Sequence, residues 1–317
     1  MSRRILGWLW LWLGLLGWAL GTQAAELRYQ LEATPVAADT WVVEGSTGNF
    51  SRDNGGNIVN VAFIATGAGV VVIDTGPSRL YGEALRELIA RTTNEPISHV
   101  LLTHHHPDHV FGNQAFDPDT LYMLAQGRQA LAREGEAFAD NLYRLVGDWM
   151  RGTEVVVPRH TLEPGVLTVG GHRLRLLEYS GHTGSDLVVF DETTGVLFAS
   201  DMLFYNRALT TPQSPGLMIW AQELVALAEL PYTLVVPGHG PVLADDSAFR
   251  QMSDYLTLLY QTLMAAASRG LSPSEVMNLP LPDRFQAIAG SRYELIRTTT
   301  HLYPRYEKAA LELLSEQ

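Results

Sequence analysis

Short apolar runs alternate with longer segments of helical periodicity through most of the chain. Residues 70–73, 100–102 and 234–236 are runs of valine, leucine and isoleucine flanked by glycine, proline or polar residues, which indicates buried strands. Residues 80–91 repeat apolar side chains at helical spacing, and residues 126–150 are predicted to be mainly helical. Further strands are predicted at Leu27–Leu31, Thr40–Val43, Glu154–Pro158 and His172–Tyr179. This alternation predicts a layered α/β architecture.

The last part of the chain has a different pattern. Residues 246–317 are largely of helical periodicity, with one long element from Phe249 to Ala267. Ser272-Pro273-Ser274-Glu275 has the form of a capped helix start. We expect a helical extension of the same domain, packed on the α/β layers or at a subunit interface of a homo-oligomer, and no chemistry is assigned to it.

Potential metal ligands interrupt the hydrophobic pattern directly after residues 100–102. Thr103-His104-His105-His106-Pro107-Asp108-His109 contains four potential ligands within six residues: His104, His106, Asp108 and His109. Neutral imidazoles suit zinc and iron(II), and a carboxylate adds negative charge. Residues two apart in an extended loop point the same way, so His104 and His106 can share one metal ion. Asp108 and His109 can turn toward a second one.

Three further candidate ligands lie where later strands meet loops. His182 follows a predicted strand within Ser180–Ser185, Asp201 ends the apolar run 195–199, and His239 ends the run 234–236. Because each lies at a strand end, all can project to one rim of a layered sheet. Glycines beside His182 and His239 allow close approach of the backbone.

The order His-x-His-x-Asp-His, Gly-His, Ser-Asp and Pro-Gly-His resembles the metallo-β-lactamase superfamily, over about residues 57–242. The segment Val70–Gly76 resembles the strand and aspartate that precede the metal loop in that family. The resemblance implies an αββα four-layer sandwich over residues 25–245 with a dinuclear site at one edge. The implied ligands are His104, His106 and His182 for one metal ion, Asp108, His109 and His239 for the other, Asp201 as the bridge, and Asp74 behind them to orient a ligand or the loop.

The same resemblance implies a reaction. Two Zn²⁺ ions would share a hydroxide that attacks a carbonyl carbon, and Asp108 would also orient the nucleophile. The expected substrates are small molecules with an ester, thioester, lactone or lactam. Asp201 as the bridge resembles the glyoxalase II and lactonase branches. The run Thr103–Phe116, with a signal segment and a helical tail, is most similar to exported zinc metallohydrolases of quinoprotein dehydrogenase and sulfur-oxidation (Sox-related) systems, which implies a periplasmic quinoprotein dehydrogenase system as partner.

Three other functions stay open at this point. The first is a mono-iron oxygenase of the persulfide dioxygenase type, which would hold Fe²⁺; the complete set of ligands for a second metal argues against it. The second is a β-lactamase-like activity, although a cysteine-containing lactamase site is excluded because the chain has no Cys. The third is a non-catalytic periplasmic protein that only binds metal.

Residues 1–24 have the pattern of a secretory signal. Arg3 and Arg4 precede the apolar stretch Ile5–Leu20, and small residues follow at Ala24 and Ala25. We expect cleavage and a periplasmic location, with a retained membrane anchor as the alternative. Removing this segment takes away two arginines and no acid, so the formal charge changes from −12 to −14. Such an acidic protein repels phosphate backbones, which argues against a nucleic-acid substrate.

Four residues are candidates for contact with the substrate. Tyr205 and Arg207 follow Asp201 and could bind polar groups of the substrate, including a carboxylate. Ordinary packing is the alternative for both. Phe50 and Arg52 lie in the Gly-, Ser- and Asn-rich segment 45–56, which is expected to overhang the site or to form an exposed turn.

Overall fold

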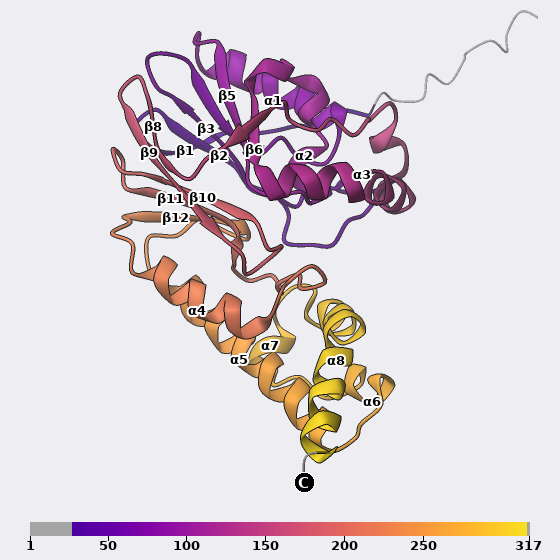
Figure 1. Cartoon of the computed structure of the whole chain (residues 1–317). Coiled ribbons are helices and arrows are strands. Elements are labelled where there is room, and N and C mark those ends of the chain that lie inside the picture. Colours follow the sequence, from indigo (N-terminus) through magenta and orange to yellow (C-terminus); the bar gives the residue numbers. More distant parts are fainter. Residues whose placement is uncertain (1–26, 316–317) are drawn as a thin grey trace, which may run out of the picture.

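Two β-sheets pack face to face, and helices cover the outer face of each (Figure 1). The computed structural model describes residues 27–315, so the predicted signal segment lies outside the described residues. The first sheet has the strand order β1 (Thr34–Ala37), β2 (Thr40–Val43), β3 (Val61–Ala65), β4 (Val70–Ile73), β5 (Ile97–Leu102), β6 (Leu121–Leu124) and β7 (His160–Leu162). The second has the order β12 (Leu234–His239), β11 (Val196–Phe204), β10 (Asp186–Asp191), β9 (His172–Tyr179) and β8 (Gly165–Val169).

The first sheet is buried on both faces, which explains its continuous apolar runs. In β4, Val70 and Val72 pack toward α1 (Arg79–Thr92) and α3 (Ala125–Val146). Val71 and Ile73 face the second sheet instead. Alternate residues of one strand therefore supply two hydrophobic layers, as the period of two in a strand requires. The predicted αββα arrangement is confirmed.

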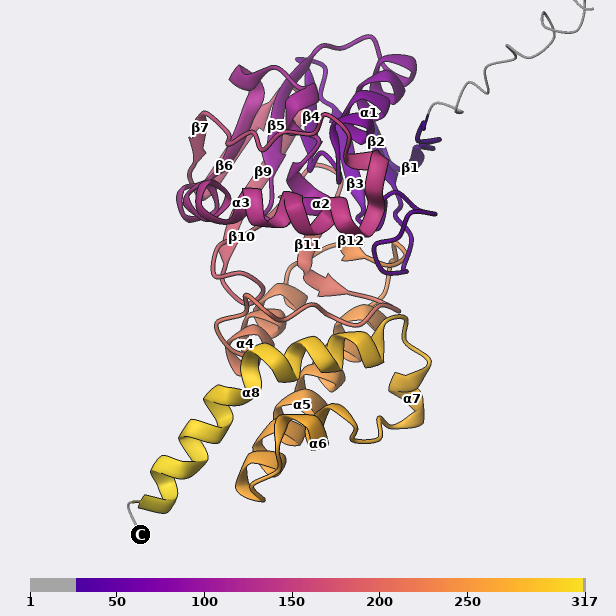
Figure 2. The same ribbon diagram turned by 90° about the vertical axis from the view of Figure 1, so that its right-hand side faces the viewer.

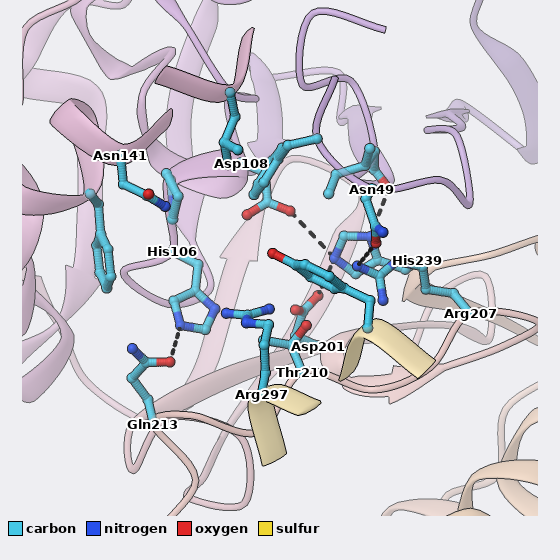
Figure 3. A pocket seen from close by; sticks show the side chains of 16 residues that line it. Asn49, His106, Asp108, Asn141, Asp201, Arg207, Thr210, Gln213, His239 and Arg297 are labelled. Atoms are coloured by element: carbon cyan, nitrogen blue, oxygen red, sulfur yellow. Dashed lines mark hydrogen bonds and ion pairs between the residues drawn. The ribbon is translucent and has the colours of Figure 1, made fainter. Parts of the chain in front are cut away.

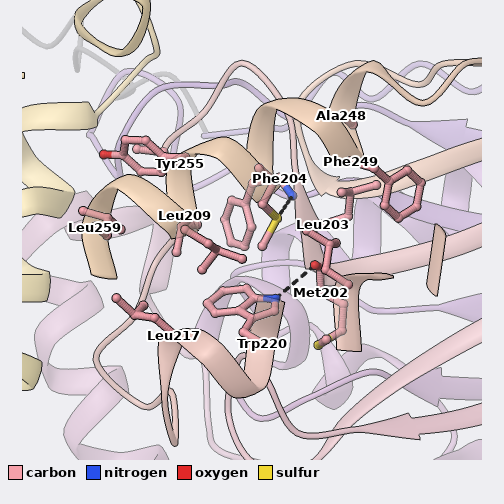
Figure 4. Packing of buried hydrophobic residues seen from close by; sticks show 14 of the residues in the cluster. Met202, Leu203, Phe204, Leu209, Leu217, Trp220, Ala248, Phe249, Tyr255 and Leu259 are labelled. Carbon is pink, nitrogen blue, oxygen red and sulfur yellow. Dashed lines mark hydrogen bonds between the residues drawn. The ribbon is translucent and has the colours of Figure 1, made fainter. Parts of the chain in front are cut away.

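The outer face of the second sheet is covered by α4 (Leu217–Ala228) and α5 (Ser247–Ser268). Trp220 of α4 is fully buried there, and its Nε1–H donates to the carbonyl of Met202 at 3.1 Å (Figure 4). The contact holds the part of β11 that directly follows Asp201. Among the described residues, no helix is both long and apolar enough to cross a membrane.

The helical C-terminal region continues the hydrophobic cluster on the second sheet. It consists of α5, α6 (Pro273–Met277), α7 (Asp283–Gln286) and α8 (Ser291–Ser315). α6 begins with the predicted capping box between Ser272 and Glu275. Figure 2 shows that the first turns of α8 pass beneath the sheets, whereas its last turns extend away from them. The start of α8 therefore lies close to the edge where the two sheets meet.

Two predicted strands are wrong. Leu27–Leu31 and Glu154–Pro158 have no strand partner. Their apolar side chains nevertheless pack: Tyr29 lies with its ring centroid 4.4 Å from that of Trp149, and the valines of 155–157 cover the cluster under α3. Apolar patterning indicated that these segments pack against the core, although Leu27 is 36% exposed, but it could not show whether the backbone pairs.

Candidate metal centre

All seven predicted ligands converge at the edge where the two sheets meet. His104 and His106 lie in the loop after β5, and Asp108 and His109 in the short helix α2 (Pro107–Val110). The second sheet supplies His182 from the β9–β10 loop, Asp201 from β11 and His239 from the end of β12. None is more than 7% exposed. Their ligand atoms form two groups, each with all atoms within 4.8 Å of one another: His104, His106, His182 and Asp201 in one, and Asp108, His109 and His239 in the other.

Asp201 lies between the two groups and directs one carboxylate oxygen at each. Its Oδ2 is 3.2 Å from Nε2 of His182 and 3.9 Å from Nε2 of His104. Its Oδ1 is 3.2 Å from Nε2 of His109 and 3.3 Å from Nε2 of His239. A carboxylate divided in this way can bridge two metal ions.

The backbone around Asp201 is irregular, and this differs from the prediction that Asp201 ends a strand. β11 continues through Asp201 to Phe204, with register shifts against β12 on both sides of Ser200. Ser200 itself has φ +45°, which is uncommon for a residue with a side chain. Irregular pairing of this kind re-aims side chains and is frequent beside active sites. Here the irregular segment directly precedes the shared carboxylate.

Asp74 supports the ligands from behind. Its Oδ1 accepts from the backbone N–H of Thr103 at 2.9 Å, and its Oδ2 accepts from Nδ1–H of His109 at 2.7 Å. The Thr103 hydroxyl donates to the same Oδ2 at 2.9 Å and lies 3.1 Å from Nδ1 of His104. One buried carboxylate thus fixes the start of the metal loop and the orientation of His109, as outer carboxylates do in metal sites.

Hydrogen bonds also determine which ring nitrogen is free in two other histidines. Nδ1–H of His239 donates to the carbonyl of Ile58 at 2.7 Å, so its Nε2 faces the cluster. His106 is reversed: its Nε2–H donates to Oε1 of Gln213 at 3.2 Å, and its Nδ1 lies 2.9 Å from Nε2 of His182. No pattern in the sequence pointed to Gln213, because it lies in a loop far from the histidine motif.

The nitrogen and oxygen atoms at the centre of the cluster are suited to bind metal ions. Nε2 of His104, Nε2 of His109 and Oδ1 of Asp201 are buried and have no hydrogen-bond partner among the described residues. Buried polar atoms are normally paired, so three orphaned atoms around one point need an explanation. Coordination by histidine nitrogen and carboxylate oxygen supplies one, and this donor set suits zinc as well as iron.

The pKa values of the histidines divide according to their surroundings. Burial, reinforced by neighbouring imidazoles, holds the pKa of His104 and of His106 well below the ordinary value. Burial alone would also lower the pKa of His109, but the carboxylates of Asp201, Asp74 and Asp108 outweigh it and hold that pKa well above the ordinary value. His104 and His106 are therefore neutral and ready to bind metal, whereas His109 must release a proton first.

A cavity of about 330 Å³ opens over the ligand cluster (Figure 3). Its floor includes His106, Asp108, Asp201 and His239. The apolar part of the wall is formed by Phe50, Ile58, Pro107, Phe138 and Leu145. The polar part is formed by Asn49, Asn141, Arg207, Thr210, Gln213, Tyr293 and Arg297. A small molecule with apolar and polar groups can therefore reach the ligand cluster.

The predicted substrate contacts have different positions in the structure. Phe50 lines the cavity, but Arg52 lines a separate surface hollow beside Trp149. Tyr205 is not among the residues that line the cavity and packs against the hydrophobic cluster of the second sheet. Arg207 lines the cavity but is only 5% exposed, and its guanidinium is engaged by neighbours of its own chain.

The C-terminal extension, to which no chemistry was assigned from the sequence, contributes to the wall of the cavity. Tyr293 and Arg297 of α8 line the cavity opposite the metal loop. They lie far along the chain from the histidine motifs, in an amphipathic helix whose charged residues look like an ordinary solvated face. Only the packing of α8 beneath the sheets brings them to the cavity.

Comparison with known proteins agrees with this geometry. The model of the "Metallo-beta-lactamase superfamily" matches residues 54–239. The "Beta-lactamase-like protein 2 homolog" of Caenorhabditis elegans is 26% identical over 200 residues, 62% of this chain and 60% of that protein. A "Hydroxyacylglutathione hydrolase" of Chelativorans sp. (strain BNC1) is 29% identical over 160 residues, 50% of this chain and 53% of that protein. The chain therefore spans less than two thirds of the length of these curated relatives.

Solved structures show the same fold at low sequence identity. The metallo-beta-lactamase from Pontibacter korlensis superposes with a TM-score of 0.58 at 22% identity, covering 72% of this chain and 99% of that one. The metallo-beta-lactamase FIM-1 from Pseudomonas aeruginosa, solved in a mono-zinc form, gives 0.58 at 16% identity, covering 73% and 96%.

Proposed function

We propose a function from one premise: the chain belongs to the metallo-β-lactamase superfamily. We infer that it is a metal-dependent hydrolase with two Zn²⁺ ions that acts on a carbonyl substrate. The observation that carries this proposal is the position of Asp201, whose two oxygens face the two ligand groups separately. A site for a single ion would not need a carboxylate divided in this way.

Each ligand has a place in the proposal. His104, His106 and His182 would hold one ion, and Asp108, His109 and His239 would hold the other, with Asp201 between them. When bound, the ions supply a hydroxide nucleophile at neutral pH and polarise the carbonyl of the substrate.

The residues of the chain then prepare this chemistry. Asp108 reaches the floor of the cavity with its Oδ2 3.4 Å from Nε2 of His239, so it can also orient the nucleophile. Asp74 and Gln213 keep His109 and His106 in the ring orientations that leave the ligating nitrogens free. The apolar side chains of the wall can pack against the non-polar part of a substrate.

The proposed substrates are an ester, thioester, lactone or lactam. The relative named as a hydroxyacylglutathione hydrolase supports a thioester, and the relative named as β-lactamase-like supports a lactam. We place the protein with the exported zinc metallohydrolases of quinoprotein (Sox-related) systems, in the periplasm. The basis is the pattern of residues 1–24 and the run Thr103–Phe116. A quinoprotein dehydrogenase system as partner and a homo-oligomeric state are part of the same proposal.

Metal content of the mature chain, purified without added metal, is the test. About two zinc ions per chain together with turnover of one member of an ester, thioester, lactone and lactam panel is the expected result. About one iron per chain with oxygen consumption on a persulfide would replace the proposal with an oxygenase. A chain in which Asp108 and His239 are both changed to Ala separates the two, since only a dinuclear enzyme should lose its activity. Full zinc loading without turnover of any panel member would favour a binding protein.

A further inference from the structure

Arg297 is the cation that α8 contributes to the cavity. Its side chain is 34% exposed and lines the same cavity as His106 and Asp201. In Figure 3 the guanidinium reaches from α8 into the cavity, on the side of the ligand cluster. It is therefore accessible to a bound small molecule rather than to bulk solvent alone.

The orientation of Arg297 is set by a buried carboxylate. Nη1 of Arg297 donates to both oxygens of Glu294, at 3.1 Å each, and Glu294 is only 1% exposed. The guanidinium carbon also lies 5.6 Å from the ring centroid of Tyr293, within reach of a cation–π contact. Nε and Nη2 of Arg297 have no acceptor among the described residues. The side chain is thus held in place on one side and keeps hydrogen-bond donors free on the other.

Arg207 cannot serve the same purpose, although it was the residue predicted to bind a carboxylate. Its Nη1 donates to the carbonyl of Ala208, and its Nη2 donates to Asn49 at 3.3 Å and to Glu294 at 3.2 Å. Glu294 therefore neutralises one of two guanidinium groups, and this part of the wall keeps an excess of one positive charge. Arg207 holds the wall together, and Arg297 is free to bind.

We propose that Arg297 determines specificity by binding an anionic group of the substrate, a carboxylate by preference, while the reacting carbonyl faces the ligand cluster. A guanidinium fork binds a carboxylate with both geometry and charge. The apolar residues Phe50, Phe138 and Leu145 would cover the body of such a molecule. The inference deepens the proposed hydrolase function and rests on it for the position of the carbonyl.

Calorimetric titration of the zinc-loaded full chain with benzoate and with benzamide is the primary test. These probes have the same ring and differ in charge. The variants are Arg297→Met, Arg297→Lys and, as a matched control, Lys308→Met, which removes one positive charge from the exposed part of the same helix. Benzoate should bind Arg297→Met about ten- to a hundredfold more weakly than it binds wild type or the control, the range for a lost charge-assisted hydrogen bond.

The affinities measured with the other probe and the other variants should depend on the charge of the probe and of residue 297. Benzamide should bind all four proteins equally, and Arg297→Lys should bind benzoate with intermediate affinity because it keeps the charge without the fork. Equal benzoate binding in all variants, or no preference of wild type for benzoate over benzamide, would overturn the proposal. Zinc content is measured for each variant. If Arg297→Met loses metal, the proposal is judged from the benzoate affinity of Arg297→Lys alone.

A turnover arm separates this proposal from the hydrolase assignment. With 4-acetoxybenzoate and its methyl ester as substrates, Arg297→Met should raise KM for the charged ester at least tenfold more than KM for the neutral ester, whereas Lys308→Met should change neither. If no ester is hydrolysed but benzoate binding depends on Arg297, the anion site stands and the hydrolase function falls. If both esters are hydrolysed and Arg297→Met has the same KM values as wild type, the anion site is refuted and the hydrolase function is supported.

Discussion

A β-carbon on Gly238 would lie 2.0 Å from Oδ1 of Asp201. Every amino acid except glycine has a β-carbon at this position, so no other residue at position 238 can avoid the overlap. The oxygen that it would meet, Oδ1 of Asp201, is directed at the ligand cluster. The glycine of the Pro-Gly-His sequence therefore has a geometric purpose. It leaves room for the shared carboxylate beside the strand that carries His239.

Replacement of Gly238 by Ala should disable the centre. The new methyl group must displace the Asp201 carboxylate, so we expect zinc affinity to fall at least tenfold and hydrolytic activity to fall with it. Inductively coupled plasma mass spectrometry on dialysed protein measures the metal retained. Gly171→Ala is the control, because its added carbon would meet only the carbonyl of Thr66 at 3.8 Å, an ordinary contact. Full zinc retention in Gly238→Ala would contradict this account of the site.

Asp74→Asn tests the support behind the ligands. Asp74 has φ +63°, and Asn tolerates this conformation about as well as Asp, so the backbone should not change. The amide can keep the bond from Thr103 N–H, but its NH₂ group cannot accept from Nδ1–H of His109. We expect zinc to bind about ten- to a hundredfold more weakly, the usual effect of losing such a partner. Competition with a chromogenic chelator measures this, and unchanged affinity would show that the Asp74–His109 contact is dispensable.

Zinc binding should release protons, and His109 should be one source. Its raised pKa means that the metal-free protein carries an imidazolium at pH 7, and a metal ion can bind Nε2 only after that proton leaves. Apparent zinc affinity should therefore rise with pH until the raised pKa is passed. His104 and His106, whose pKa values are lowered, should release none. Calorimetric titrations in buffers of different ionisation enthalpy count the protons.

The same titration on Asp74→Asn supplies the control for proton release. Removing one of the carboxylates that hold the pKa of His109 up should reduce the number of protons released per zinc ion at pH 7. A proton count that is the same in wild type and Asp74→Asn would mean that the protons come from bound water or from other groups.

Glu294→Gln should destabilise the fold rather than merely alter the cavity. Arg207 is 5% exposed, and loss of the Glu294 charge leaves a buried guanidinium without a counterion. Breaking a buried pair in this way costs about 3–5 kcal/mol. Urea unfolding at one fixed free zinc concentration measures the change in the free energy of unfolding. Asp254→Asn, which breaks the exposed pair with Arg284, should cost no more than about 1 kcal/mol, and equal effects would refute the distinction.

The layers, and the gathering of the seven candidate ligands at one edge, could be predicted because their signals are local. An apolar run such as 70–73 indicates burial by itself, and a histidine beside a glycine at a strand end indicates a position at the rim. The bridging position of Asp201 came from resemblance. The irregular pairing at Ser200 directs the Asp201 side chain toward the ligand cluster. It leaves no pattern in the sequence, because a register shift depends on the neighbouring strand β12.

Phe50 and Arg207 were predicted to lie at the site and do line the cavity, but the rest of the cavity wall could not be predicted, for a related reason. Gln213, Tyr293 and Arg297 reach the site only through the packing of a loop and of α8 against the sheets. Arg207 was singled out because it follows Asp201 in the chain. It does line the cavity, but its guanidinium is almost fully buried and bound by Glu294, which the sequence did not indicate. Sequence order predicts the ligands that strands carry and does not predict which surface side chains close over them.

The match to the family model ends at His239, whereas Arg297 and its buried partner Glu294 belong to α8. If Arg297 binds the anionic group of the substrate as proposed, the candidate metal ligands and this specificity-determining residue are encoded in separate stretches of the chain. Recombination between relatives at the β12–α5 connection would transplant substrate preference while the catalytic half stayed intact. Relatives that share every candidate metal ligand could in this way differ in substrate range by exchanging only their C-terminal helical regions.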